Sequence, residues 1–172
     1  MTDWDTTLPQ PLWKLHQLKF DYADGEGIDF EPYSFFMTAK ETSQWFKAWT
    51  GNADVDGAEF RIFGQDGTGG YAAFWLVELH DSVLEQPVVF FGSEGEMGVV
   101  ATNFEHYLWL LANGVGPYEA IAYPGIMREP VGAFRNFAEE HSGTGPMKPE
   151  EVLAKAKSAY PEFVEKVRSL CR

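Results

Sequence analysis

The runs FRIFGQDGTGGYAAFW, residues 60–75, and PVVFFGSEGEMGVVA, residues 87–101, decide the fold of this chain. Both contain stretches of apolar, aromatic and β-branched residues, separated by short turns that are rich in glycine or in acidic residues. Two such stretches joined by a glycine-containing turn are typical of an antiparallel hairpin. The sequence therefore predicts an antiparallel meander over residues 60–101, and the segments around it are expected to be helix or loop.

The strand expected over residues 71–79 is predicted to lie in the middle of this sheet. Side chains alternate between the two faces of a strand, and in this stretch both sets are largely apolar. A strand that is apolar on both faces is typical of a sheet that is covered on two sides. Pro87 is expected at the start of the next strand, residues 88–91, where its missing N–H costs least. The last strand is expected at residues 97–101.

A helix is predicted shortly before the sheet. Thr38 and Glu41 have the spacing of a capping box, in which the threonine hydroxyl accepts the N–H of the residue three positions later. Gly51 supplies a stop signal, so the helix is expected to end near Trp49. Trp45 and Trp49 lie four residues apart and share one helix face. We expect this pair to pack into the core, with an exposed recognition patch as the alternative.

Helices are also predicted for most of the chain after the sheet. Thr102 and Glu105 form a second capping-box pattern, which opens a helix to Asn113 with Gly114 as its stop. The pattern is helical again from Pro117 onward. Breaks are expected at residues 124–125 and 142–149 and at Pro161, which should split or kink the last helix.

Length and composition indicate one domain, residues 1–172, of the α+β class, with a central and mainly antiparallel sheet flanked by helices. A chain of 172 residues, 45% of them hydrophobic, is long enough to bury a core without disulfide bonds or metals. The one cysteine, Cys171, excludes an internal disulfide and a cysteine-based metal cluster. The sequence lacks a secretory signal and any apolar run near the roughly 18 residues that span a bilayer. We therefore expect a cytoplasmic protein with no membrane partner.

Charge is unevenly distributed along the chain. The formal net charge is −13, and residues 62–127 contain eight Asp or Glu residues but no Lys or Arg. Binding to nucleic acid depends on contacts from Lys and Arg to phosphate, so this bias argues against a nucleic-acid partner. An acidic surface instead attracts a basic protein and accelerates their encounter. The alternative is an acidic surface that only keeps the protein soluble.

The motifs of the chain predict no catalytic residues, no metal ligands and no cofactor. The glycine-rich run 64–70 leads into a strand, whereas phosphate-binding loops lead into a helix. Its glycines are expected to occupy turn positions with positive φ. The acidic run 21–29 lacks the ligand spacing of a calcium-binding EF-hand, and the four histidines lack the spacing of a zinc site.

Acidic residues in the expected turns and at the strand ends are the candidate partner-binding residues. Their carboxylates would complement the positive surface of a basic partner protein. The candidates are Asp66, Glu78, Asp81, Glu85, Glu94 and Glu96.

Three runs of the chain resemble the SUKH superfamily, which includes yeast regulators of cell-wall assembly, bacterial Syd proteins and many bacterial immunity proteins. The runs are FGQDGTGGYAAFW at 63–75, PVVFFGSEGE at 87–96 and VVATNFEHYLWLLANG at 99–114. The resemblance rests on their order: a glycine-rich hairpin, an acidic hairpin and a capped helix.

This resemblance implies an α+β fold with a mainly antiparallel sheet and a non-enzymatic role in protein binding. Bacterial members of this kind typically act as immunity proteins that neutralise a cognate toxin, often a nuclease. No catalytic residue is implied. The region after Gly114 matches least, so the choice of partner could be specified there. The matching motif residues would be structural: Gly67, Gly69, Gly70, Pro87 and Gly95.

The sequence is compatible with three functions. The first, which the sequence favours, is an immunity or antitoxin protein that occludes a basic toxin. The second is an intracellular regulator or scaffold of the same fold with no toxin partner. The third is an enzyme or small-ligand protein with its site on the glycine-rich turn, which predicts a pocket with several convergent polar groups.

Overall fold

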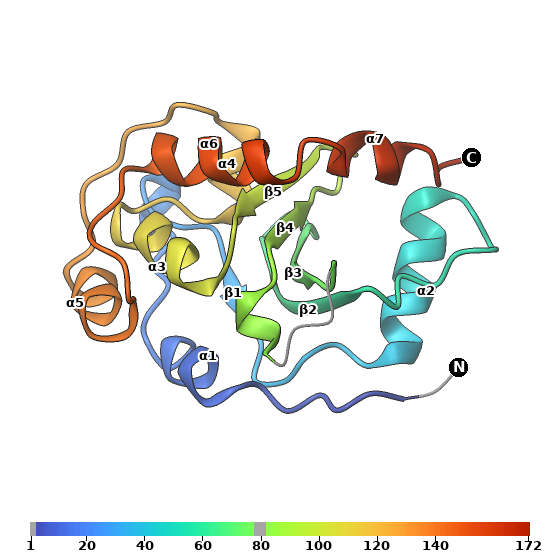
Figure 1. Cartoon of the computed structure of the whole chain (residues 1–172), viewed down its shortest axis with the longest axis horizontal. Coiled ribbons are helices and arrows are strands. Elements are labelled where there is room, and N and C mark those ends of the chain that lie inside the picture. Colours follow the sequence, from blue (N-terminus) through green and yellow to red (C-terminus); the bar gives the residue numbers. More distant parts are fainter. Residues whose placement is uncertain (1–2, 78–81) are drawn as a thin grey trace.

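A computed structural model describes residues 3–77 and 82–172 of the chain. These residues form a five-stranded sheet in the order β1-β2-β3-β4-β5, in which every neighbouring pair is antiparallel (Figure 1). The α+β class and the meander are therefore confirmed. The strands are β1 (Glu31–Pro32), β2 (Phe60–Gln65), β3 (Tyr71–Trp75), β4 (Val88–Phe91) and β5 (Met97–Ala101).

Helices precede, follow and cover the sheet. Short 3-10 turns lie at η1 (Ala23–Gly25) and η2 (Val83–Glu85). In the part of the chain that the structure describes, none of the helices is both long and apolar enough for a membrane span. The α-helices are α1 (Gln10–Leu15), α2 (Ala39–Thr50), α3 (Phe104–Ala112), α4 (Pro117–Ala122), α5 (Gly132–His141), α6 (Pro149–Ala159) and α7 (Phe163–Arg168).

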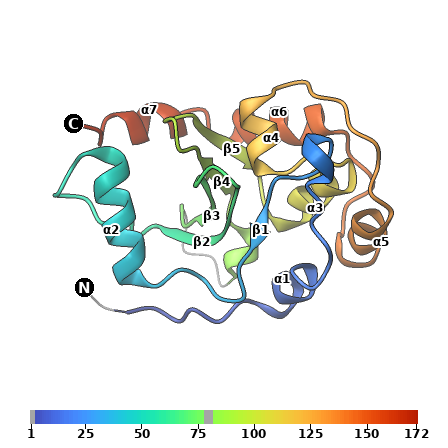
Figure 2. The ribbon, with the colours of Figure 1, turned by 180° about the vertical axis from the view of Figure 1, so that it is seen from behind.

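The sheet separates two hydrophobic clusters, one on each of its faces. Neighbouring residues of the central strand β3 belong to different clusters, Phe74 to the first and Trp75 to the second. The first cluster packs against α1, α3, α4 and α5, and the second against α2 and α7. Figure 1 shows the sheet between α2 on one side and α3 and α5 on the other, and Figure 2 shows the same layers from behind. The prediction that β3 is covered on both faces is therefore confirmed.

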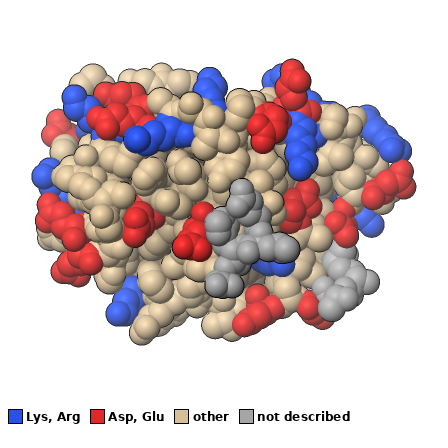
Figure 3. Space-filling view, in the orientation of Figure 1, with Lys and Arg blue, Asp and Glu red and all other residues tan. Residues whose placement is uncertain are grey.

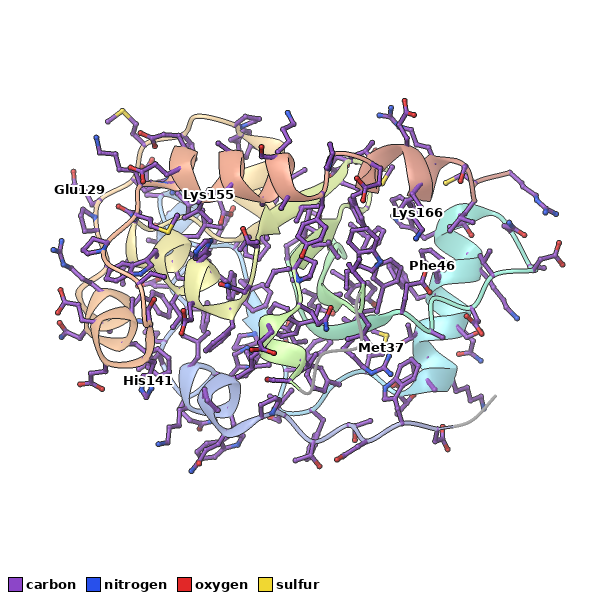
Figure 4. The ribbon with its side chains drawn as sticks, in the orientation of Figure 1. Met37, Phe46, Glu129, His141, Lys155 and Lys166 are labelled. Atoms are coloured by element: carbon purple, nitrogen blue, oxygen red, sulfur yellow. The ribbon has the colours of Figure 1, made fainter. Side chains whose placement is uncertain are left out.

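The first capping box forms as predicted. The Thr38 hydroxyl accepts the Glu41 N–H at 3.2 Å, and a Glu41 carboxylate oxygen accepts the Thr38 N–H at 3.2 Å. Gly51 ends the helix with φ of 66°. Trp45 and Trp49 are half-buried against the second cluster, which confirms the core-packing prediction for this pair. Figure 4 shows Phe46, from the same helix, directed toward the sheet.

The second predicted capping box is wrong by one residue. The Asn103 side-chain oxygen, not the Thr102 hydroxyl, caps α3 by accepting the His106 N–H at 2.9 Å. The Thr102 hydroxyl is buried and has no hydrogen-bond partner among the residues that the structure describes. Both residues have good capping side chains, and the backbone leaving β5 decides which one faces the helix.

The strand predicted over residues 71–79 is shorter than expected within the described residues, and its last two positions, 78–79, lie outside them. β3 ends at Trp75, because the Val77 N–H turns back to the Trp75 carbonyl at 2.9 Å and to the Gln86 side chain at 3.0 Å. Pro87 precedes β4 as predicted, and the helical pattern near the C-terminus is split at Pro161, between α6 and α7.

The glycines of the run 64–70 are required for different reasons. Gly69 has φ of 94°, as the sequence predicted, but Gly64, Gly67 and Gly70 do not have positive φ. A Cβ added at Gly64 would overlap the Phe30 ring, and one added at Gly70 would lie 2.7 Å from both the Asp66 carboxylate and the Phe90 ring. The positive-φ interpretation is therefore confirmed for Gly69 and wrong for the other three, and close packing is the reason for glycine at Gly64 and Gly70.

Candidate functional site

The sheet register brings distant segments together at one end of the sheet. Tyr71 pairs with both Gln65 and Phe91, and Gln65 also pairs with Glu31. The β2–β3 turn, the β4–β5 turn and the start of β1 therefore share one end. This end, residues 29–31, 64–71 and 91–97, is termed the hairpin end below.

The structure divides the six candidate acidic residues between different places. Glu94 is exposed and Glu96 half-buried in the β4–β5 turn, at the hairpin end. Glu85 is exposed in η2, just before β4, and so lies at the opposite end of the sheet. Glu78 and Asp81 fall outside the described residues. The candidates therefore do not form one group.

Asp66 lies at the hairpin end, but it stabilises a turn. Its residue is only 1% exposed. One carboxylate oxygen accepts the Thr68 N–H and hydroxyl, each at 2.6 Å, and the Gly70 N–H at 3.1 Å. An Asp side chain that binds backbone two residues onward is a common turn-forming device. Because this side chain is buried and one of its oxygens holds the turn with three hydrogen bonds, we remove Asp66 from the candidate binding surface.

Two acidic residues that the sequence analysis did not select line an open groove beside the hairpin end. Glu31 and Glu41 border this groove, which has a volume of about 1130 Å³ and lies between β1 and the first half of α2. The connection from β1 to α2 can be followed in Figure 2. We term it the β1–α2 groove. Polar and aliphatic residues also line it, together with five aromatic residues: Tyr33, Phe35, Phe36, Trp45 and Tyr71.

The aromatic walls of the β1–α2 groove are held by contacts with the sheet. The Trp45 and Tyr71 rings meet edge to face with centroids 5.2 Å apart, and the Tyr33 hydroxyl donates to the Gln65 side chain at 2.5 Å. Burial, the neighbouring Tyr71 and the Glu31 charge, in that order, raise the pKa of Tyr33. The groove therefore combines fixed aromatic surface with negative potential.

Further acidic groups lie at the hairpin end, outside the lining of the groove. Asp29 accepts the Gly67 N–H at 2.8 Å, and the Glu96 carboxyl group folds over Gly92. The Trp49 indole N–H donates to the Gly92 carbonyl at 2.8 Å, which ties α2 to the β4–β5 turn. Carboxylates from two separate segments, Asp29 and Glu31 from one and Glu94 from the other, thus lie at one end of the sheet.

Many of the basic residues lie on another face of the molecule. Figure 3 shows Lys and Arg side chains interspersed with acidic ones along the upper edge of the view, over α6 and α7. Figure 4 places Lys155 at α6 and Lys166 at α7. Among the described residues, those that line the β1–α2 groove include no Lys or Arg. The fold thus separates an acidic, aromatic groove from a face of mixed charge.

His16 packs among aromatic rings and contacts Tyr33, a residue that lines the groove. Its ring packs with the Phe20, Phe30 and Phe63 rings, and its Nδ1 lies 2.7 Å from the Tyr33 carbonyl oxygen. Burial lowers the pKa of His16 to about 4, although the hydrogen bond to Tyr33 opposes that shift. Its Nε2 is buried without a partner in the described part of the chain, so a proton there would have no acceptor among those residues.

We expect His16 to destabilise the protein progressively as the pH falls from 6.5 to about 4. In this window the unfolded chain binds a proton at His16 and the folded chain does not, so stability falls with pH. The full effect is about 3 kcal/mol. Urea unfolding of wild type and His16→Phe at pH 7 and pH 4 measures it. An equal loss of stability in both proteins would contradict the assignment.

Comparison with protein-family models, with curated proteins and with solved structures found no match to this chain. Within residues 3–77 and 82–172, no three His, Cys, Asp or Glu side chains are grouped so that they could hold a metal ion. What the hairpin end and its groove offer is a set of carboxylates beside aromatic rings. Both groups attract cations, the carboxylates by charge and the rings through their electron-rich faces.

Proposed function

We propose that this chain is a non-enzymatic immunity or antitoxin protein of the SUKH type. In this proposal it binds a basic toxin, such as a nuclease, and neutralises it by covering the toxin's functional surface. A nuclease acts on nucleic acid inside the cell, so the protein that neutralises it is placed in the cytoplasm.

The observation that carries this proposal is the concentration of carboxylates at the hairpin end. Glu94 and Glu96 come from the stretch without Lys or Arg, and Glu31 and Glu41 extend the acidic surface into the β1–α2 groove. A nuclease must present positive charge to its nucleic-acid substrate. Opposite potentials on the two proteins would speed their encounter and favour this partner over acidic ones.

The resemblance to the SUKH superfamily adds independent support from the sequence. Its motif glycines Gly69 and Gly95 have positive φ, and Pro87 stands immediately before β4, as expected for residues with structural roles. The resemblance implies protein binding rather than catalysis. The charge distribution and the sequence motifs therefore favour the same class of function.

Reversing charge at the hairpin end is expected to weaken partner binding by about 100-fold, since charged contacts at interfaces contribute on the order of 1 kcal/mol or more each. The variant carries Glu31→Lys, Glu94→Lys and Glu96→Lys. The partner is captured from a lysate of the source cells, and its Kd is measured by calorimetry.

A matched control carries the same change in net charge on the face of mixed charge over α6 and α7, at positions outside the hairpin end. It combines Glu150→Lys and Glu151→Lys in α6 with Glu165→Lys in α7, all of them exposed. We expect less than about a threefold change in Kd from this control, because distant charges are screened by salt. Equal losses in the two variants would mean that net charge, not the hairpin end, determines binding.

Co-expression then separates a toxin-neutralising role from a regulatory one. The captured partner, expressed alone in a heterologous host, should arrest growth, and co-expression of this protein should restore it. A partner without toxicity, together with a growth defect when the gene is deleted in pure culture, would instead support the regulator or scaffold.

A further inference from the structure

We propose that the β1–α2 groove binds an arginine side chain on an extended segment of a protein partner. This inference deepens the proposed function, on which it rests, by naming the chemistry through which a basic partner is recognised.

The walls of the groove suit a flat cation. Trp45 and Tyr71 form an edge-to-face pair at one side, and Phe35 stands 65% exposed in the lining. An exposed phenylalanine beside half-buried aromatic rings leaves apolar surface that a long side chain can cover. The guanidinium group of arginine is planar and stacks on aromatic rings, and its methylene stem packs on apolar surface.

The charges in the groove are fixed in place. A Glu41 carboxylate oxygen accepts both the N–H and the hydroxyl of Thr38, at 3.2 Å and 2.8 Å, and these bonds lower the pKa of Glu41. The Glu31 carboxylate accepts the Gln65 amide at 3.2 Å. The side chains that line the groove, all within the described residues, supply no cation to offset these two carboxylates. A guanidinium group, which can bind a carboxylate with two parallel hydrogen bonds, is the complementary group.

The nearby Arg61 on β2 does not fill the groove. Its guanidinium donates to the Ala58 and Phe60 carbonyls, at 2.8 Å and 3.2 Å, and lies 3.7 Å over the Trp4 ring. Trp4 in turn donates its indole N–H to the carbonyl of Met37, a residue that lines the groove and is labelled in Figure 4. Arginine stacked on tryptophan is therefore already used next to the groove.

The edge of the sheet favours recognition through a side chain. β1 is an edge strand of two residues, and Pro32 has no N–H to offer to an added strand. The isolated bridge between Thr7 and Phe35 occupies further backbone beside it. An incoming segment therefore gains little from strand pairing along β1, and its side chain must supply the specificity.

Titration with a blocked tripeptide, acetyl-Gly-Arg-Gly-amide, tests this site without any native partner. Nuclear magnetic resonance of the full-length protein should show saturable shifts at the Trp45 indole N–H and at Phe35, with Kd in the millimolar range, as for a single weak contact. The same peptide with citrulline, which is neutral and nearly the same shape, should bind at least tenfold more weakly. Glu31→Gln should weaken arginine binding about fivefold.

Glu94→Gln is the matched control, because Glu94 is exposed at the hairpin end but does not line the groove. It should leave the arginine Kd unchanged. Absence of shifts up to about 20 mM peptide, equal binding of citrulline, or equal binding of a lysine tripeptide would each overturn the proposal.

These experiments distinguish a failure of the groove assignment from a failure of the proposed function. If the charge-reversal variant loses its protein partner and the tripeptide does not bind, the groove assignment is wrong and the proposed function stands. If the tripeptide binds and charge reversal leaves the protein partner bound, the groove assignment stands and the hairpin end is not the interface.

Discussion

Replacing Phe91 with alanine is expected to lower the free energy of unfolding by about 4 kcal/mol. Phe91 ends β4 and is 1% exposed. Its ring centroid lies 5.2 Å from those of both Trp45 and Trp49 and 4.9 Å from that of Phe60. Truncation would remove the transfer free energy of a buried ring and leave a cavity that these large, rigid neighbours fill poorly.

Urea denaturation of Phe91→Ala and of Phe35→Ala provides the measurement and its control. Phe35 is 65% exposed, so its truncation should change the free energy of unfolding by less than about 0.5 kcal/mol. Trp45 packs against Phe91 and also lines the β1–α2 groove. Phe91→Ala should therefore also broaden the resonance of the Trp45 indole N–H. A cost below about 1 kcal/mol for Phe91→Ala would mean that the second cluster is not a packed core.

Local signals in the sequence predicted the elements of the fold well. The capping box at Thr38 depends on residues three positions apart, so its partners can be found by counting along the chain. The alternation in β3 likewise predicted that Phe74 and Trp75 face different clusters. Predictions failed where a backbone direction decides between equivalent residues, as at Thr102 and Asn103. Which of these two residues caps α3 depends on the direction in which the chain leaves β5.

The candidate site was harder to predict, because it depends on register rather than on local pattern. Acidic residues in turns were expected at the surface, yet Asp66 folds inward to satisfy the backbone of its own turn. Glu31 comes from far earlier in the chain and joins the hairpin end only because it pairs with Gln65. Sequence spacing gives no sign of this pairing, so the acidic groove could not have been found without the sheet order.

Glu119 makes one hydrogen bond that the local sequence pattern predicts and one, to a distant segment, that it does not. Pro117 and Glu119, just after Gly116, have the pattern of a helix N-terminus, with proline at the first helical position and glutamate at the third. One carboxylate oxygen accepts the Gly116 N–H at 3.0 Å, as this pattern suggests. The other accepts the Asp29 N–H at 3.1 Å, from a residue 90 positions earlier. Glu119 therefore joins α4 to the segment that enters β1.

Two opposing effects decide what Glu119 contributes to stability. Burial raises the pKa of Glu119, because desolvation of the charged form outweighs the backbone hydrogen bonds that favour it. Removing the carboxylate ends that desolvation cost, but it leaves the N–H groups of Gly116 and Asp29 without their acceptor. An unsatisfied buried donor costs about 1–3 kcal/mol, so two of them outweigh the relief.

We therefore expect Glu119→Ala to lower the free energy of unfolding by about 3 kcal/mol, and Glu119→Gln, which keeps one acceptor oxygen, by about half as much. Urea unfolding measures both costs, and Glu94→Gln, at an exposed position, is the control with the same loss of charge.

Amide hydrogen exchange adds a local readout, since the Asp29 and Gly116 N–H groups should lose protection in Glu119→Ala. If both amides stayed protected and stability were unchanged, other groups would hold α4 to the β1 segment. Because that segment carries Glu31 into the β1–α2 groove, loss of protection at Asp29 would also show that the groove depends on a carboxylate buried behind it.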